Sequence, residues 1–190
     1  MTYTIDDLAW LFSRLYNSKI NGIVIGSTII ELELGQRRFE DDVDIFALSP
    51  NPLIEEEAYM EIASRESWQY SYTALGTPKF VVRAPSGGEI IVEFYENIHD
   101  FYIPEEIIQR AMSKRIRGVT IRLLQLEDYI VLKAKAAREK DVEDLRIIKE
   151  YIDRGKLKLD QRMLKQALEH IPKEDRNVAV NKLRQIGFKV

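Results

Sequence analysis

The segments GIVIGS, residues 22–27, and DVDIFAL, residues 42–48, decide the fold of this chain. The first is a short, mostly β-branched run bounded by glycines, which is typical of a buried strand that ends in a tight turn. In the second, acidic and apolar residues alternate, which predicts another strand with one face in the core. We therefore expect both segments to be strands of one sheet.

Helices are expected on either side of these strands. Residues 4–16 open with Thr4 and Asp7 in capping-box spacing and continue with apolar residues at helical intervals. A short helix is expected to run through Leu34, and residues 53–65 indicate a third helix with an acidic first turn. The first part of the chain thus predicts the order helix, strand, helix, strand, helix.

The rest of the chain divides into a β-rich part and a helical part. Further strands are predicted as a meander at residues 68–73, 79–84 and 89–95, then a helix from Pro104 to about residue 112 and a hairpin over residues 114–124. Helical spacing then recurs over residues 126–137, 142–152, 161–170 and 173–186. We expect a mixed α/β (α+β) domain over residues 1–124 and a C-terminal helical bundle over residues 125–190 packed on it.

Composition limits the chemistry. The chain has 190 residues, no cysteine and two histidines, His99 and His170, which lack ligand spacing and are expected to be structural or at the surface. Any metal must therefore be held by oxygen ligands. A net charge of −3 argues against a surface that binds nucleic acid throughout. The sequence shows neither a signal segment nor a membrane span of ~18 apolar residues, so a cytoplasmic location without a membrane partner is expected.

Asp42 and Asp44 are the first candidates for a metal site. Residues two apart in a strand point to the same face, with Cα atoms ~7 Å apart. Two carboxylates that converge usually hold a cation, and magnesium suits oxygen ligands and substrate phosphates. The pair therefore predicts a site for a nucleoside triphosphate with two magnesium ions ~4 Å apart. The alternative is a solvated acidic turn at the start of a strand.

Two further features accompany the aspartates. Glu93, between Val92 and Phe94, is the expected third acid, and Glu89 lies on the same face of its strand and remains an alternative. The glycine of Gly26-Ser27 permits close approach of the backbone, and the serine hydroxyl and the amides of the next helix are suited to phosphate. The alternatives are a surface glutamate at position 93 and a plain helix-capping serine.

The order of these motifs resembles the nucleotidyltransferase superfamily that includes DNA polymerase beta and the aminoglycoside nucleotidyltransferases. That family's pattern of Gly-Gly or Gly-Ser followed by Asp-x-Asp between hydrophobic residues appears here over residues 20–95. The resemblance implies that Ser27 contacts a triphosphate, that Asp42 and Asp44 bind magnesium, and that Glu93 supports the general base or a second metal. One departure is that the third acid of the family is usually aspartate.

A second resemblance lies further along the chain. Residues 126–130, then Lys133, then residues 138–145 are similar to the helical region of the abortive-infection type nucleotidyltransferase toxins and their relatives. It implies that Lys133 contacts the triphosphate and that Asp141 or Asp144 positions this lysine or shapes the site. The alternative is a solvated helix whose neighbour is simply capped by Asp141.

These observations predict an enzyme that transfers a nucleotidyl group from a nucleoside triphosphate to a hydroxyl, with release of pyrophosphate. The acceptor is open among tRNA, a protein hydroxyl and a small molecule. Basic residues of the hairpin at positions 114, 115, 117 and 122 would be the place for RNA phosphates, or else belong to an ordinary exposed hairpin. The alternative function is a non-catalytic nucleotide- or partner-binding module, such as one component of a toxin and antitoxin pair.

Overall fold

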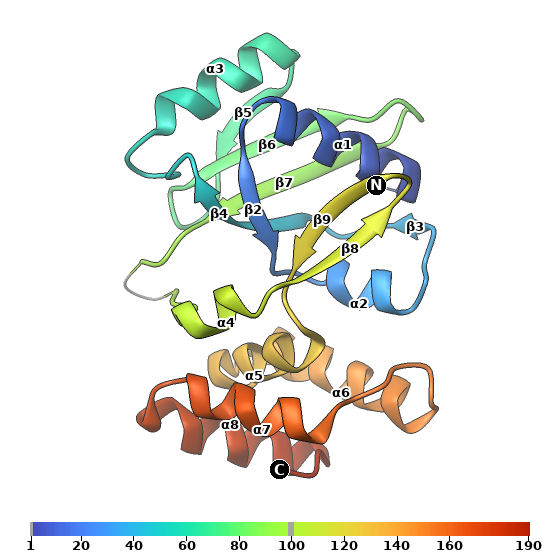
Figure 1. Cartoon of the computed structure of the whole chain (residues 1–190), viewed down its shortest axis with the longest axis vertical. Coiled ribbons are helices and arrows are strands. Elements are labelled where there is room, and N and C mark those ends of the chain that lie inside the picture. Colours follow the sequence, from blue (N-terminus) through green and yellow to red (C-terminus); the bar gives the residue numbers. More distant parts are fainter. Residues whose placement is uncertain (1, 99–100) are drawn as a thin grey trace. The chain divides into compact units, whose positions relative to one another are not determined.

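The computed structural model describes residues 2–98 and 101–190, which form two compact units (Figure 1). We call the first the α/β unit, residues 1–102 and 112–123, and the second the helical unit, residues 103–111 and 124–190. His99 lies outside the described residues. The expected division at residue 124 differs from this one, because residues 103–111 group with the helices.

The α/β unit is built on a mixed sheet of seven strands in the order β5-β6-β7-β4-β2-β9-β8. The strands are β2 (Asn21–Val24), β4 (Val43–Ser49), β5 (Gln69–Tyr72), β6 (Pro78–Arg83), β7 (Glu89–Tyr95), β8 (Met112–Ile116) and β9 (Val119–Leu123). Strand β4 lies between β2, to which it is antiparallel, and β7, to which it is parallel. The predicted mixed α/β fold, the meander and the hairpin are confirmed.

A small two-stranded sheet was not predicted. Strand β1 (Tyr3–Thr4) pairs with β3 (Arg38–Phe39), within a polar segment that carries no alternation. The rings of Tyr3 and Phe39 stack with centroids 5.4 Å apart, and both side chains are buried. The burial of two aromatic rings thus stabilises a pairing too short to leave a sequence pattern.

Three helices complete the α/β unit: α1 (Ile5–Asn17), α2 (Thr28–Glu33) and α3 (Glu56–Glu66). Helix α1 begins with the expected capping box between Thr4 and Asp7. On one face of the sheet, Tyr59 of α3 packs against Phe94 and Phe80 of the strands, with ring centroids 4.9 and 6.1 Å apart. Because side chains alternate along a strand, the neighbours of these buried rings point to the opposite face of the sheet.

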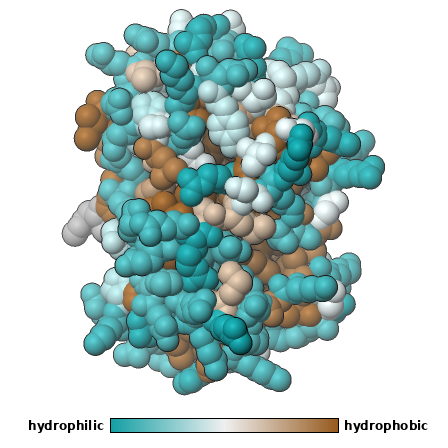
Figure 2. All heavy atoms as spheres, viewed as in Figure 1, coloured by the Kyte–Doolittle hydropathy of each residue, from teal (hydrophilic) through white to brown (hydrophobic). Residues whose placement is uncertain are grey.

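The helical unit contains five helices: α4 (Glu105–Gln109), α5 (Leu126–Ala136), α6 (Glu139–Asp153), α7 (Gln161–His170) and α8 (Lys173–Ile186). Ile107 and Ile108 of α4 are buried, and α4 contacts α7. None of the helices in residues 2–98 and 101–190 is long and apolar enough to cross a lipid bilayer. On the face drawn in Figure 2, hydrophilic residues predominate.

A buried carboxylate joins α4 and α5 within the helical unit. Asp128 is fully buried, and neither of its carboxylate oxygens has a hydrogen-bond partner. The nearest cation is Arg110, whose Nη1 lies 3.6 Å from Oδ1, which is an ion pair without a hydrogen bond. Burial raises the pKa of Asp128 to about 6, although Arg110 opposes this shift.

We expect Asp128→Asn to change how stability depends on pH. The folded pKa lies above the unfolded value, so the folded state binds more protons between about pH 4 and pH 6. The contribution of Asp128 to stability is therefore present below about pH 4 and falls by about 2–3 kcal/mol as the pH rises through 6. Urea unfolding of both proteins between about pH 4 and pH 8 tests this. If the free energy of unfolding depended on pH in the same way in the variant and in the natural chain, this prediction would be contradicted.

Candidate active site

Asp42 and Asp44 lie at the start of the central strand of the sheet. Asp42 immediately precedes β4 and Asp44 is its second residue, and both side chains are half-buried. Their neighbours Val43 and Ile45 are buried, with 0% and 2% exposure. The expected alternation is confirmed, because apolar residues anchor the strand while the aspartates take the other face.

Gly26 brings the end of β2 against Asp44. The amide of Ile25 donates to the backbone oxygen of Asp44 at 2.9 Å, which continues the pairing of β2 and β4 beyond the strand. A Cβ atom at Gly26 would lie 2.0 Å from Oδ2 of Asp44 and 2.9 Å from its Cβ. Residue 26 must therefore be glycine for the carboxylate of Asp44 to occupy this position.

Ser27 follows at the beginning of α2 but does not cap it. The residue occupies the N-cap position, and its side chain makes no capping hydrogen bond. The alternative interpretation of a plain helix-capping serine is thus not the arrangement found. Its contact with a triphosphate stays a prediction.

Glu93 of β7 lies next to Asp44 on the adjacent parallel strand. The two residues are direct partners in the register of β4 and β7. Oε1 of Glu93 accepts a hydrogen bond from Nζ of Lys79 at 2.8 Å, and Oε2 accepts one from the hydroxyl of Tyr95. Both carboxylate oxygens are therefore engaged by side chains on the same face of the sheet.

The pKa shifts of Lys79 and Tyr95 show that both side chains interact with the nearby carboxylates. The pKa of Lys79 is raised, first by its hydrogen bond with Glu93 and further by the charges of the two aspartates. Burial raises the pKa of the Tyr95 hydroxyl, and Glu93 and the aspartates raise it further. The carboxylates of Asp42, Asp44 and Glu93 thus act on the same two neighbours.

Lys79 and Tyr95 were missed by the sequence analysis. Tyr95 lies two residues after Glu93 and shares its face, so strand alternation would have found it. Lys79 lies opposite Glu93 in the antiparallel pairing of β6 and β7. Finding this lysine required the register of the hairpin, which the turn at residues 84–88 alone does not define.

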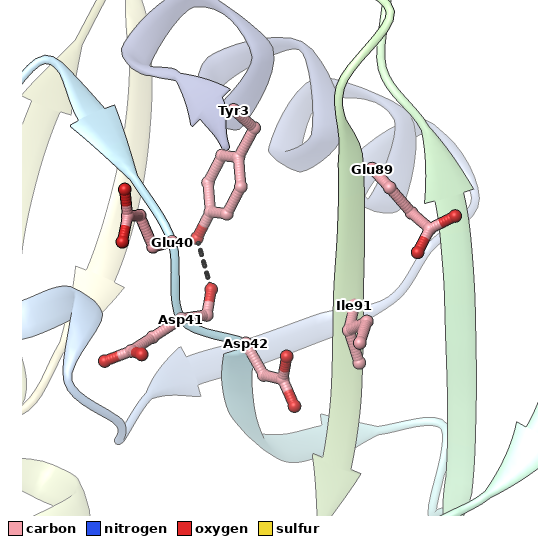
Figure 3. Close-up of a pocket in the computed structure, with 6 residues that line it drawn as sticks. All are labelled: Tyr3, Glu40, Asp41, Asp42, Glu89 and Ile91. Carbon is pink, nitrogen blue, oxygen red and sulfur yellow. Dashed lines mark hydrogen bonds between the residues drawn. The ribbon is translucent and has the colours of Figure 1, made fainter. Parts of the chain in front are cut away.

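Glu89 lies further along β7, near Asp42. A small pocket is lined by Tyr3, Glu40, Asp41, Asp42, Glu89 and Ile91 (Figure 3). In it the hydroxyl of Tyr3 donates to the backbone oxygen of Asp41 at 3.1 Å, and the side chain of Asp42 points towards β7. Glu31 lies close by, and burial and the charge of Asp41 raise its pKa to about 7. The surroundings of Asp42 are therefore rich in carboxylates.

Within residues 2–98 and 101–190, no group of three or more carboxylate or imidazole side chains is arranged to hold a metal ion. Glu93 is turned to Lys79 and Tyr95, and a metal site at Asp42 and Asp44 stays a prediction. Magnesium commonly binds to one or two carboxylates and completes its shell with water and substrate phosphates. The backbone of Gly26 lies against the carboxylate of Asp44, where any side chain would clash, and the two half-buried aspartates beside it fit such a site.

The second predicted cluster lies within the helical unit. Nζ of Lys133 in α5 lies 2.8 Å from Oδ1 of Asp141 and 2.8 Å from Oδ2 of Asp144, both in α6. Asp141 is fully buried and also accepts from the backbone amide and the guanidinium of Arg138. Asp141 therefore has two roles, because it caps α6 and also forms an ion pair with Lys133.

The ionised forms of Lys133 and Asp141 stabilise each other. Burial lowers the pKa of Lys133, but Tyr129 and the two aspartates outweigh it and raise the pKa above its usual value. Burial raises the pKa of Asp141, but its hydrogen bonds with Arg138 and Lys133 outweigh it and lower the pKa. Both aspartates contact the ammonium of Lys133, whereas their role in positioning it and its contact with a triphosphate stay predictions.

Two basic residues of the β8–β9 hairpin, Lys114 and Arg117, form ion pairs with acidic side chains. Lys114 lies 2.8 Å from Glu33, and Arg117 lies 2.9 Å from Asp6. Both pairs are formed within the α/β unit and are partly exposed. Two of the four basic residues considered for RNA are therefore paired with acids.

Two solved structures and one protein-family model are similar to this chain. An antigenic nucleotidyltransferase-like protein from Paracoccidioides brasiliensis is similar in fold, with a TM-score of 0.56 and 15% identity over 97% of this chain and 90% of that one. The antibiotic-resistance factor ANT(2″)-Ia has a TM-score of 0.48 and 13% identity over 95% of this chain and 91% of that one. No curated protein matches the chain. A family model described as "nucleotidyl transferase of unknown function (DUF2204)" matches residues 4–185, and the chain belongs to this family.

Proposed function

We propose that the chain is a magnesium-dependent nucleotidyltransferase that transfers a nucleotidyl group from a nucleoside triphosphate to a hydroxyl acceptor. The observation that carries this proposal is the close approach of Gly26 to the carboxylate of Asp44, since a Cβ atom at Gly26 would lie 2.0 Å from Oδ2. A surface acidic turn has no need of such a contact. The membership of a nucleotidyl transferase family supports the same reaction class.

Each acidic residue has a proposed task. Asp42 and Asp44 would hold the divalent cation, which when bound neutralises charge on the leaving pyrophosphate. Glu93 would accept the proton of the acceptor hydroxyl, because it lies beside Asp44 on the next strand. The Ser27 hydroxyl would donate to a phosphate oxygen. The proposal rests on the residues of the α/β unit alone.

The bonds of the reaction balance without a further reactant. The acceptor oxygen forms a bond to the α-phosphorus as the bond from that phosphorus to the pyrophosphate oxygen breaks. The hydroxyl proton passes to Glu93, and the negative charge leaves with pyrophosphate. The products are the nucleotidylated acceptor and pyrophosphate.

The test is an assay with each α-labelled nucleoside triphosphate and magnesium, with total tRNA, with a protein mixture, or with no acceptor. We expect label in one acceptor class and pyrophosphate in equal amount. An Asp42→Asn/Asp44→Asn variant serves as the inactive control. Transfer that persists in this variant would overturn the proposed site.

The same proteins distinguish transfer from binding. A nucleotide that binds only the folded chain raises its melting temperature. A magnesium-dependent rise without any transfer to RNA, protein or small hydroxyl compounds would favour the binding module that the sequence left open. Transfer of label would exclude that alternative.

A further inference from the structure

Glu93 is the acid whose surroundings are least suited to an open metal site. Lys79 and Tyr95 engage its two carboxylate oxygens, and the side chain of Glu93 is only 15% exposed. A metal ion that binds at Glu93 would therefore compete with these partners for the carboxylate. Of the two, Lys79 carries the positive charge that a cation would replace.

We propose that the ammonium group of Lys79 takes the place of the metal ion in the free protein, where it neutralises Glu93. When a divalent cation binds to Asp42 and Asp44, Lys79 releases Glu93. This inference rests on the proposed function, since it assumes a cation at the two aspartates. Lys79 is thus a positioning residue, which decides when the third acid becomes available.

The arrangement of the charged side chains around Glu93 supports this exchange. Asp44 and Glu93 are partners on adjacent parallel strands, and Lys79 is the partner of Glu93 on the other side. Three neighbouring carboxylates repel one another unless a cation lies among them. In the metal-free protein Lys79 supplies this positive charge. When a divalent cation supplies it instead, the cation repels the Lys79 ammonium, which is then no longer needed to neutralise Glu93.

A second ion pair in the same unit offers a matched control. Nζ of Lys114 lies 2.8 Å from Oε1 of Glu33, the same distance as in the pair of Lys79 with Glu93. The two lysine side chains are 24% and 29% exposed, so they are similarly accessible. Lys114 reaches from the hairpin to α2 and has no part in the site.

The first experiment measures the magnesium dissociation constant by calorimetry, without nucleotide, for the natural chain and for Lys79→Met, Lys79→Arg and Lys114→Met. We expect Lys79→Met to bind magnesium about tenfold more tightly and Lys114→Met to be unchanged within about twofold. Lys79→Arg should restore the weaker binding. Equal affinities for the natural chain and Lys79→Met would overturn the proposal.

Glu93→Gln separates competition from simple repulsion across space. If Lys79 competes with the ion for the Glu93 carboxylate, Lys79→Met gains affinity only while that carboxylate is present. We therefore expect no gain from Lys79→Met in a Glu93→Gln background. A gain of the same size there would show that Lys79 only repels the ion, and would overturn the exchange.

Labelling of lysine amines tests the exchange in the natural chain and needs no variant to fold. Reductive methylation followed by peptide mass spectrometry should show Lys79 reacting faster with magnesium, while Lys114 is unchanged. Magnesium that binds but leaves Lys79 unreactive would overturn this inference and leave the proposed function intact. Binding that is unaffected in Asp42→Asn/Asp44→Asn would instead overturn the proposed site, and the inference with it.

Discussion

Asp44→Asn should lower kcat/KM for nucleotidyl transfer by at least about 1000-fold, a loss of about 4 kcal/mol of transition-state stabilisation. The amide keeps the shape of the side chain but lacks the charge that holds the cation. Stability should change little or rise slightly, because one member of a repelling set of carboxylates becomes neutral. Steady-state kinetics at several magnesium concentrations, together with urea unfolding, measure both effects.

Asp41→Asn is the matched control for this prediction. Asp41 is exposed and lies in the same acidic stretch, and its part in the structure is a backbone oxygen that accepts from Tyr3. Its substitution removes the same charge three residues before Asp44, so the activity of this variant should stay within about threefold of the natural chain. Equal losses for the two variants would mean that the assay reports net acidity and not a site at Asp44.

Gly26→Ala should reduce activity by at least about 100-fold in a chain that still folds. The new Cβ atom would lie 2.0 Å from Oδ2, 2.8 Å from Cγ and 2.9 Å from Cβ of Asp44, so this side chain must turn away. Overpacking of this kind typically costs about 1–3 kcal/mol of stability. The loss of activity should exceed what the unfolded fraction explains, since the clash falls on the carboxylate that we propose holds the cation.

Gly22→Ala is the control that separates the loss of activity from the loss of stability. At Gly22 the new Cβ would lie 2.4 Å from Cγ2 of Ile45 and 2.7 Å from the backbone oxygen of Phe46, away from the acids. We expect a similar or larger loss of stability with normal activity per folded molecule. Activity lost in proportion to folding in both variants would contradict the role of Gly26 beside Asp44.

The sequence predicted the parts of the site that depend on local patterns. Strand alternation placed Asp42 and Asp44 beside each other on one face, and the same alternation left the choice between Glu89 and Glu93. Glu93 is in register with Asp44 whereas Glu89 lies near Asp42, and this geometry favours Glu93 in a choice that stays a prediction. Register between distant strands depends on tertiary packing, which a single sequence does not display.

Features that depend on long-range pairing could not be predicted. The partnership of Lys79 with Glu93 requires the hairpin register, and the pairing of β1 with β3 requires that residues 3 and 39 meet. The grouping of α4 with the helical unit has the same origin, because Ile107 and Ile108 are buried by helices that follow much later in the chain. Local spacing identified β6, β7 and α4 but not their partners, and it identified neither β1 nor β3.

Each of the two units is built from two separate segments of the sequence, which restricts how the chain can be cut into folded fragments. The chain leaves the α/β unit after residue 102, returns at residue 112 and leaves again after residue 123. A fragment ending at residue 124 would keep α4 without the helices that bury it, and one ending at residue 102 would lack β8 and β9. No single cut of the chain therefore yields an intact unit, and either unit can be isolated only by rejoining separate stretches of the sequence.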